Sequence, residues 1–208
     1  MNINADWKIK QNSDVLQGGS GMNRLELLNK AKPILFNTEM VVAILDNKKT
    51  VTRRIVKFKG TKNPNWTGYV QDGLNLYNGN NEICNRKPPY KIGDILYVCK
   101  SIHMPKEAAR IFLRVKNVRL ERLQDIVTGD YKTTLNINAE GIYKPYCNCT
   151  HINGDCKDFI SQNDCKLLNK FKNLWDGTVK KPDIECYGWK ANPWVWVIEF
   201  ERITEEMK

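Results

Sequence analysis

The sequence predicts an α+β domain, built as a partly closed, mixed or antiparallel β-barrel of about five to six strands with flanking helices. Several short segments are rich in β-branched and aromatic residues, but they do not alternate regularly with helical patterns as the strands of a doubly wound sheet would. Long stretches rich in Gly, Asn, Pro and Lys separate them. With 208 residues, 41% of them hydrophobic, the chain can bury the core of one sizeable domain.

The first expected elements lie between residues 33 and 57. Residues 33–36 (PILF) form a short apolar strand candidate. Asn37 or Thr38 can cap a following helix whose apolar positions are Met40, Val41, Ile44 and Leu45. That helix should end near Asn47, which tolerates a left-handed turn. Residues 48–57 (KKTVTRRIVK) then become extended, and residues 58–92 are expected to be loops.

The remaining strands follow in the second half of the chain. Residues 94–99 form one candidate, and residues 110–123 alternate apolar and polar side chains with a break at Asn117, after which the period of two resumes. Residues 194–200 (WVWVIEF) are strongly strand-like. Between them we expect a polar segment, 124–165, and a helix over 164–175 with a buried apolar stripe.

Composition and charge favour an anionic partner. The chain carries 33 Lys and Arg against 23 Asp and Glu, which gives a formal net charge of +10, and nucleic acid is the commonest partner of such a protein. The alternative is that the charges only keep the protein soluble. No apolar run is long enough to span a membrane, and the N-terminus lacks the apolar centre of a secretory signal. We therefore expect a soluble cytoplasmic protein without a membrane partner.

The ends of the predicted domain follow from a Gly/Ser-rich stretch. Residues 17–21 (QGGSG) precede Met22 and are typical of a flexible linker. We expect residues 1–21 to be a leader, a tag or a native extension, and residues 22–208 to form a single domain.

A cysteine-rich insertion is expected at about residues 143–166. Four cysteines and a histidine fall within 19 residues, a density that allows a tetrahedral structural zinc site, although the spacing is not a common one. The candidate ligands are Cys147, Cys149, Cys156 and Cys165, with His151 as the spare. Free thiols in a loop are the alternative.

Residues 48–57 also hold candidate binding groups. In an extended segment Thr50, Thr52 and Arg54 face one way, and Val51, Arg53 and Ile55 the other. Hydroxyls and a guanidinium on one wall can contact an anion or a base edge. An edge strand kept soluble by its charges is the alternative. Among the tryptophans, Trp189, Trp194 and Trp196 can stack on bases, but the alternation of the last two with valine places most of them in the core.

The order of three features is similar to that in the ASCH family, whose members have a PUA-like β-barrel. An apolar helix is followed by residues 47–54 (NKKTVTRR), a loop, and residues 91–98 (KIGDILYV). Three further blocks, residues 33–37, 101–110 and 192–200, resemble a phage and prophage subgroup of that family. Together these blocks cover nearly all of the chain outside the leader.

The resemblance implies a cleft lined by the basic turn that binds RNA, DNA or a modified nucleoside. One small bacterial branch of the family is an amidohydrolase that removes the acetyl group from N4-acetylcytidine with a lysine, a threonine and a glutamate. Matched residue by residue, these fall on Lys49, Thr52 and Glu140, which can supply a base, a nucleophile and an orienting carboxylate. Glu140 can instead be a solvated carboxylate at a helix end. The expected ligand contacts are Thr50, Arg53, Arg54, Lys57 and His103.

Two departures from the family pattern favour binding over catalysis. The relatives usually carry glycine where Asn47 stands, and an Arg-Glu pair where this chain has Cys99-Lys100. The lost acid removes a group that catalysis would use. A third hypothesis is a phage factor that binds a host protein through the leader or the cysteine-rich insertion.

Overall fold

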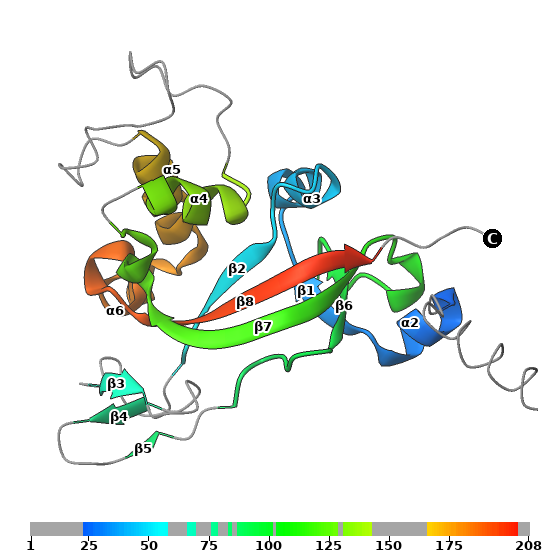
Figure 1. The fold of residues 1–208 in the computed structure, drawn as a ribbon, viewed down its shortest axis with the longest axis horizontal. Coiled ribbons are helices and arrows are strands. Elements are labelled where there is room, and N and C mark those ends of the chain that lie inside the picture. Colours follow the sequence, from blue (N-terminus) through cyan, green and yellow to red (C-terminus); the bar gives the residue numbers. More distant parts are fainter. Residues whose placement is uncertain are drawn as a thin grey trace, which may run out of the picture.

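The computed structural model describes residues 23–57, 66–69, 76–78, 83–84, 87–101, 103–128, 131–142 and 166–203. Its main feature is a five-stranded mixed sheet with the strand order β1-β6-β7-β8-β2 (Figure 1). The strands are β1 (Lys32–Leu35), β2 (Val51–Ile55), β6 (Ile95–Cys99), β7 (Phe112–Arg122) and β8 (Trp194–Ile203). Only β1 and β6 run parallel, and the other neighbours are antiparallel. The predicted α+β class and the predicted strands of the main sheet are thus confirmed.

The predicted barrel closure is wrong, because the sheet is open. The edge strands β1 and β2 form no ladder with each other in the described part of the chain. Side chains join them instead: Arg54 of β2 donates to the carbonyl oxygen of Leu35 at 2.8 Å, and the Tyr90 hydroxyl donates to that of Pro33 at 2.6 Å. A guanidinium therefore lies where a barrel would have main-chain hydrogen bonds.

The long strands β7 and β8 are the centre of the sheet. Their register shifts between Val115 and Asn117, which matches the break predicted at Asn117 and is a β-bulge. Residues 194–198 are all buried, so both faces of β8 are covered and both Trp194 and Trp196 belong to the core. The core prediction for these two tryptophans is confirmed.

Two helices precede β2. Helix α2 (Arg24–Lys30), which the sequence analysis did not predict, is capped by Asn23, and α3 (Thr38–Leu45) is capped by Asn37, whose side chain accepts from the Met40 amide at 2.9 Å. After α3, Asn47 adopts the predicted left-handed conformation with φ of +55°. This turn sends the chain into the Lys49 region.

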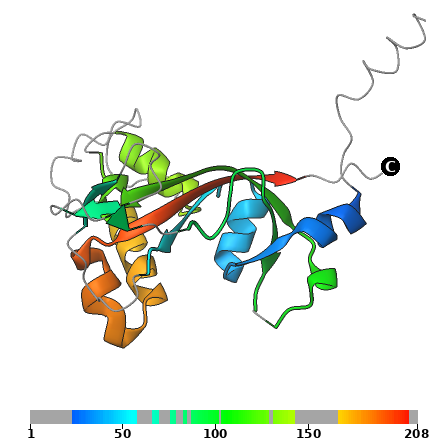
Figure 2. The same cartoon turned by 90° about the horizontal axis from the view of Figure 1, so that it is seen from below.

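Three further helices lie at one end of the β7–β8 pair, whereas α2 lies at the other (Figures 1 and 2). They are α4 (Tyr131–Ala139), α5 (Lys166–Thr178) and α6 (Ile184–Tyr187), and short 3₁₀ turns cover Lys106–Ala108, Leu123–Ile126, Lys181–Asp183 and Trp189–Ala191. Helix α5 buries Leu168, Phe171 and Trp175, as its predicted stripe requires. Helix α4 falls in a segment that we expected to be polar and without elements.

The segment 58–92, which we expected to be loops, contains a second small sheet. Strands β3 (Trp66–Tyr69), β4 (Leu76–Asn78) and β5 (Ile83–Cys84) pair antiparallel in that order. Leu76 is fully buried and joins the main core, which ties this small sheet to the domain. Among the described helices, none is both long and apolar enough to cross a membrane. The leader and the cysteine-rich insertion lie outside the described residues.

Candidate functional site

Lys49 and Glu140 are 91 positions apart in the chain and lie side by side in the fold. The turn at Asn47 leads into Lys49, whose amide donates to the carbonyl of Ala43 at the end of α3. Lys49 and Glu140 then form an isolated antiparallel bridge, and the Thr50 amide donates to the carbonyl of Ala139 at 2.9 Å. The end of α4 is thereby fastened to the start of β2.

Gly141 permits this close approach. Its φ is +81°, and a Cβ built there would lie 2.9 Å from the Cβ of Ala43 and 3.0 Å from that of Lys49. Side chains almost never come so close, and non-glycine residues rarely adopt this backbone conformation. A glycine directly after Glu140 is therefore required for the Lys49–Glu140 contact.

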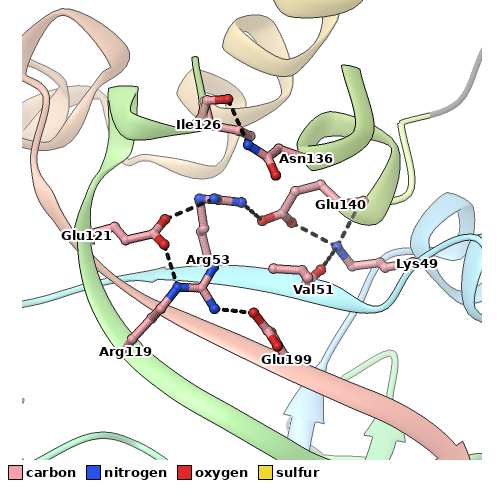
Figure 3. Close-up of polar contacts among 9 residues, drawn as sticks. All are labelled: Lys49, Val51, Arg53, Arg119, Glu121, Ile126, Asn136, Glu140 and Glu199. Carbon is pink, nitrogen blue, oxygen red and sulfur yellow. Dashed lines mark hydrogen bonds and ion pairs between the residues drawn. The ribbon is translucent and has the colours of Figure 1, made fainter. Parts of the chain in front are cut away.

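The Glu140 carboxylate bridges two cations (Figure 3). Its Oε2 accepts from Lys49 Nζ at 3.0 Å and its Oε1 from Arg53 Nη1 at 2.7 Å. Lys49 Nζ also donates to the carbonyls of Val51 and Glu140, each at 2.7 Å, which uses all three ammonium protons. Lys49 is 4% exposed and Glu140 6%. The alternative of a solvated Glu140 at a helix end does not describe this residue.

The ion pairs continue across the sheet. Arg53 also donates to Glu121 at 3.1 Å, Glu121 accepts from Arg119 at 2.5 Å, and Arg119 in turn contacts Glu199 (Figure 3). The strand register explains the alignment, because Arg53 lies opposite Val197 and Val197 lies opposite Arg119, which places these side chains on one face. The Arg53 Nε is buried without a hydrogen-bond partner in the described structure.

Burial and charge act in opposite directions on the two central groups. Burial alone would raise the pKa of Glu140, but the charges and hydrogen bonds of Lys49 and Arg53 outweigh it and hold that pKa below its ordinary value. Burial lowers the pKa of Lys49, and the Glu140 charge offsets only part of this effect. Glu140 is therefore an anion at neutral pH, and Lys49 loses its proton more readily than an exposed lysine.

A pocket of about 90 Å³ opens beside this cluster. We call it the Lys49 pocket. Its walls combine three aromatic rings with polar and charged groups: Phe36, Phe171 and Trp175 on the one hand, and Asn37, Lys49, Thr52, Arg53, Arg54, Glu140 and Thr178 on the other. The Thr52 hydroxyl has no hydrogen-bond partner within the described residues, so it can serve a ligand.

Arg54 differs from its neighbour Arg53 in its partners. Arg53 contacts two carboxylates, whereas Arg54 makes no ion pair within the described ranges. Its guanidinium carbon lies 5.3 Å from the centre of the Phe36 ring, and one of its five N–H donors reaches the Leu35 carbonyl. The remaining donors are open to a ligand at the edge of the pocket.

The other predicted site residues are dispersed. Thr50 and His103 are exposed and line no cavity that the structure describes, and His103 does not cap the turn that follows it. Lys57 lines a second cavity. The zinc ligands Cys147, Cys149, Cys156 and Cys165 lie outside the described residues, where zinc remains a prediction. Within the described residues no group of three metal-ligating side chains occurs.

Sequence reasoning missed the far wall of the pocket. Phe171 and Trp175 were predicted only as the buried stripe of a helix, and Phe36 only as part of an apolar strand. A core residue and a pocket residue have the same apolar spacing in sequence. Glu121 was also missed as a partner of Arg53, because its role depends on the order of the strands.

The fold and the site define an α+β domain with an open mixed sheet and a polar, aromatic-walled pocket at its β2 edge. No family model matches the sequence, and no curated protein matches it. One solved structure with a similar arrangement is the ASCH domain from Lactobacillus crispatus JV V101, with 10% sequence identity and a TM-score of 0.38; the match covers 90% of this chain and 98% of that one. A TM-score this low does not establish a common fold. The resemblance to the ASCH family therefore continues to rest on the sequence motifs.

Proposed function

We propose that this chain is a phage-type ASCH protein that binds RNA, DNA or a modified nucleoside, with a base in the Lys49 pocket. The observation that carries the proposal is the combination of aromatic walls with an unpaired arginine and a free hydroxyl in one cavity. Aromatic faces stack on any base, and guanidinium and hydroxyl donors recognise base edges or phosphates. The net charge of +10 adds a long-range attraction for such ligands.

The neutralised cluster supports binding more than cleavage. Lys49 and Arg53 direct their donors at protein acceptors, so they hold the pocket floor in place. Thr52, Arg54 and Asn37 are the polar groups left to contact a ligand. A rigid floor with a few free polar groups is the usual design of a small-ligand site.

Arg54→Ala should weaken the binding of a short single-stranded RNA. A lost charge-assisted contact of about 1.5–3 kcal/mol corresponds to a roughly 10- to 100-fold rise in Kd. Fluorescence anisotropy at fixed salt measures it. Arg114→Ala, which removes an exposed arginine of β7 that lines no described cavity, is the matched control and should leave Kd within about twofold, since it loses only a diffuse charge effect. Equal losses in the two variants would show that only net charge matters.

Amide hydrolysis is the second candidate, and one observation favours it. Lys49, Thr52 and Glu140, the three residues matched to the amidohydrolase branch, all line the same pocket. In such a reaction the Thr52 hydroxyl attacks the amide carbon, its proton passes to a neutral Lys49, and the amine leaves with a proton. Burial lowers the pKa of Lys49 in the required direction, but the Glu140 anion opposes the neutral form. Hydrolysis therefore ranks second.

Thr52→Ala should abolish this activity if it exists. Incubation of the protein with N4-acetylcytidine, followed by chromatography of the released cytidine, should show a loss of about 10²-fold or more. Thr52→Ser retains a hydroxyl and should keep a measurable rate. Release by Thr52→Ala at the wild-type rate, or no release by the wild type, removes the enzymatic hypothesis and leaves the binding proposal intact.

A further inference from the structure

A second cavity lies directly beyond the Lys49 pocket. It has a volume of about 350 Å³, and its walls include the end of β2 and the segment before β6. We call it the Lys57 cavity and define it by Arg54, Lys57, Lys87, Pro89, Tyr90 and Trp196. It is much larger than the Lys49 pocket.

Arg54 belongs to both cavities. Its guanidinium lies over the ring of Phe36, which lines the Lys49 pocket, and Tyr90, which lines the Lys57 cavity, hydrogen-bonds to the neighbouring edge strand at Pro33. The gap left by the open sheet edge is therefore divided by one arginine side chain. A ligand that extends out of the Lys49 pocket past Arg54 enters the Lys57 cavity.

The charges of the Lys57 cavity have one sign. Arg54, Lys57 and Lys87 line it, and no carboxylate is among its described lining residues. None of the three cations makes an ion pair with another described residue. Elsewhere in the described structure cations such as Lys32 and Lys116 do pair with a carboxylate. Three unpaired cations around one hollow attract an anion and lose little by binding it.

We propose that the Lys57 cavity is a phosphate subsite, so that the ligand of the Lys49 pocket is a phosphorylated nucleoside unit and not a free nucleoside. This inference rests on the function proposed above. The base lies between the aromatic walls, Arg54 contacts the sugar–phosphate junction, and Lys57 and Lys87 contact the phosphate. The phosphate can be that of a free nucleotide or of a strand, which the experiment separates.

The double variant Lys57→Ala/Lys87→Ala tests the subsite. Kd is measured by calorimetry for the four ribonucleosides, their 5′-monophosphates and a ten-nucleotide RNA of mixed sequence, each at several salt concentrations. For the RNA, the slope of log K against log salt should become shallower by about 1.4, from about 0.7 for each lost phosphate contact on a single strand. The control Lys30→Ala/Lys100→Ala removes the same charge from exposed positions that line neither cavity and should leave the slope unchanged.

The ligands identify the source of the phosphate. Monophosphates that bind more tightly than nucleosides, by a margin that the double variant removes, support a free nucleotide. A margin seen only for the RNA, and lost in the double variant, supports a strand. RNA or monophosphate binding whose salt slope and affinity are the same in the double variant and in the wild type overturns the subsite but keeps the proposed function. Wild-type protein that binds none of these ligands overturns both.

Discussion

Glu140→Gln should lower the free energy of unfolding by about 3–5 kcal/mol, because the substitution leaves two buried cations without their counter-ion. Lys49 and Arg53 are both buried, and Glu140 is the carboxylate that they share. The glutamine amide keeps the shape of the side chain but carries no charge, and one of its ends would present N–H donors to a cation. Urea unfolding at neutral pH, followed by circular dichroism, measures the loss.

The pH dependence of the same variant separates charge from packing. Because the folded state holds the pKa of Glu140 below the ordinary value of 4.5, the ionised carboxylate stabilises the fold fully above that value. The stabilisation is lost as pH falls through the lower, folded-state pKa. The difference in stability between wild type and Glu140→Gln should therefore shrink as the protein is acidified below about pH 4.5.

An exposed glutamate provides the control for this experiment. Glu201 pairs with Lys116 at 3.3 Å, but half of its side chain is exposed. Glu201→Gln should change stability by no more than about 1 kcal/mol. A loss of under about 1 kcal/mol in Glu140→Gln would show that the Lys49–Glu140–Arg53 cluster is not a major source of stability. A larger loss that did not vary with pH would assign the effect to packing.

The main sheet was predictable because its strands carry strong local signals. β7 alternates between its two faces and shows the bulge as an interruption of that period at Asn117. β8 consists almost entirely of β-branched and aromatic residues. Closure of the sheet was not predictable in the same way. Whether two edge strands meet depends on the space between them, and here the Arg54 side chain joins those edges.

Helix α4 was missed for the opposite reason. Its sequence, YKTTLNINA, is rich in Thr and Asn, which are weak helix formers, and only Ile137 and Thr133 are shown as fully buried among its side chains. The helix is held by its surroundings: Asn136 donates to the Ile126 carbonyl at 3.2 Å, and Thr133 accepts from the Thr128 amide at 2.8 Å. Tertiary contacts outweighed local propensity.

The pairing of Lys49 with Glu140 was proposed from a family resemblance, and the structure brings the two residues together. The role of Arg53 followed from neither motif nor spacing. Strand alternation placed it away from Thr52 and Arg54, yet its long side chain reaches Glu140 and lines the same pocket. Its partner Glu121 belongs to β7, which reaches β2 only through β8. Such a cluster can be predicted only when the strand order is known.

Gly141→Ala should destabilise the domain by about 2–5 kcal/mol, since it combines a strained backbone with a steric clash. The added methyl group would lie about 3 Å from the side chains of Ala43 and Lys49, and neither neighbour can move freely. Ala43 is packed in α3, and Lys49 is held by its three hydrogen bonds. Urea unfolding again measures the loss.

Gly93→Ala is the matched control, because Gly93 has a similar φ of +86° but a methyl group added there would meet no atom within 4 Å. It should cost only the backbone strain, about 1–2 kcal/mol. The excess loss in Gly141→Ala then measures how tightly the end of α4 is pressed against Lys49. Equal losses in the two variants would mean that α4 can retreat from β2 at little cost, and that the Lys49–Glu140 contact does not depend on the close approach of these two backbones.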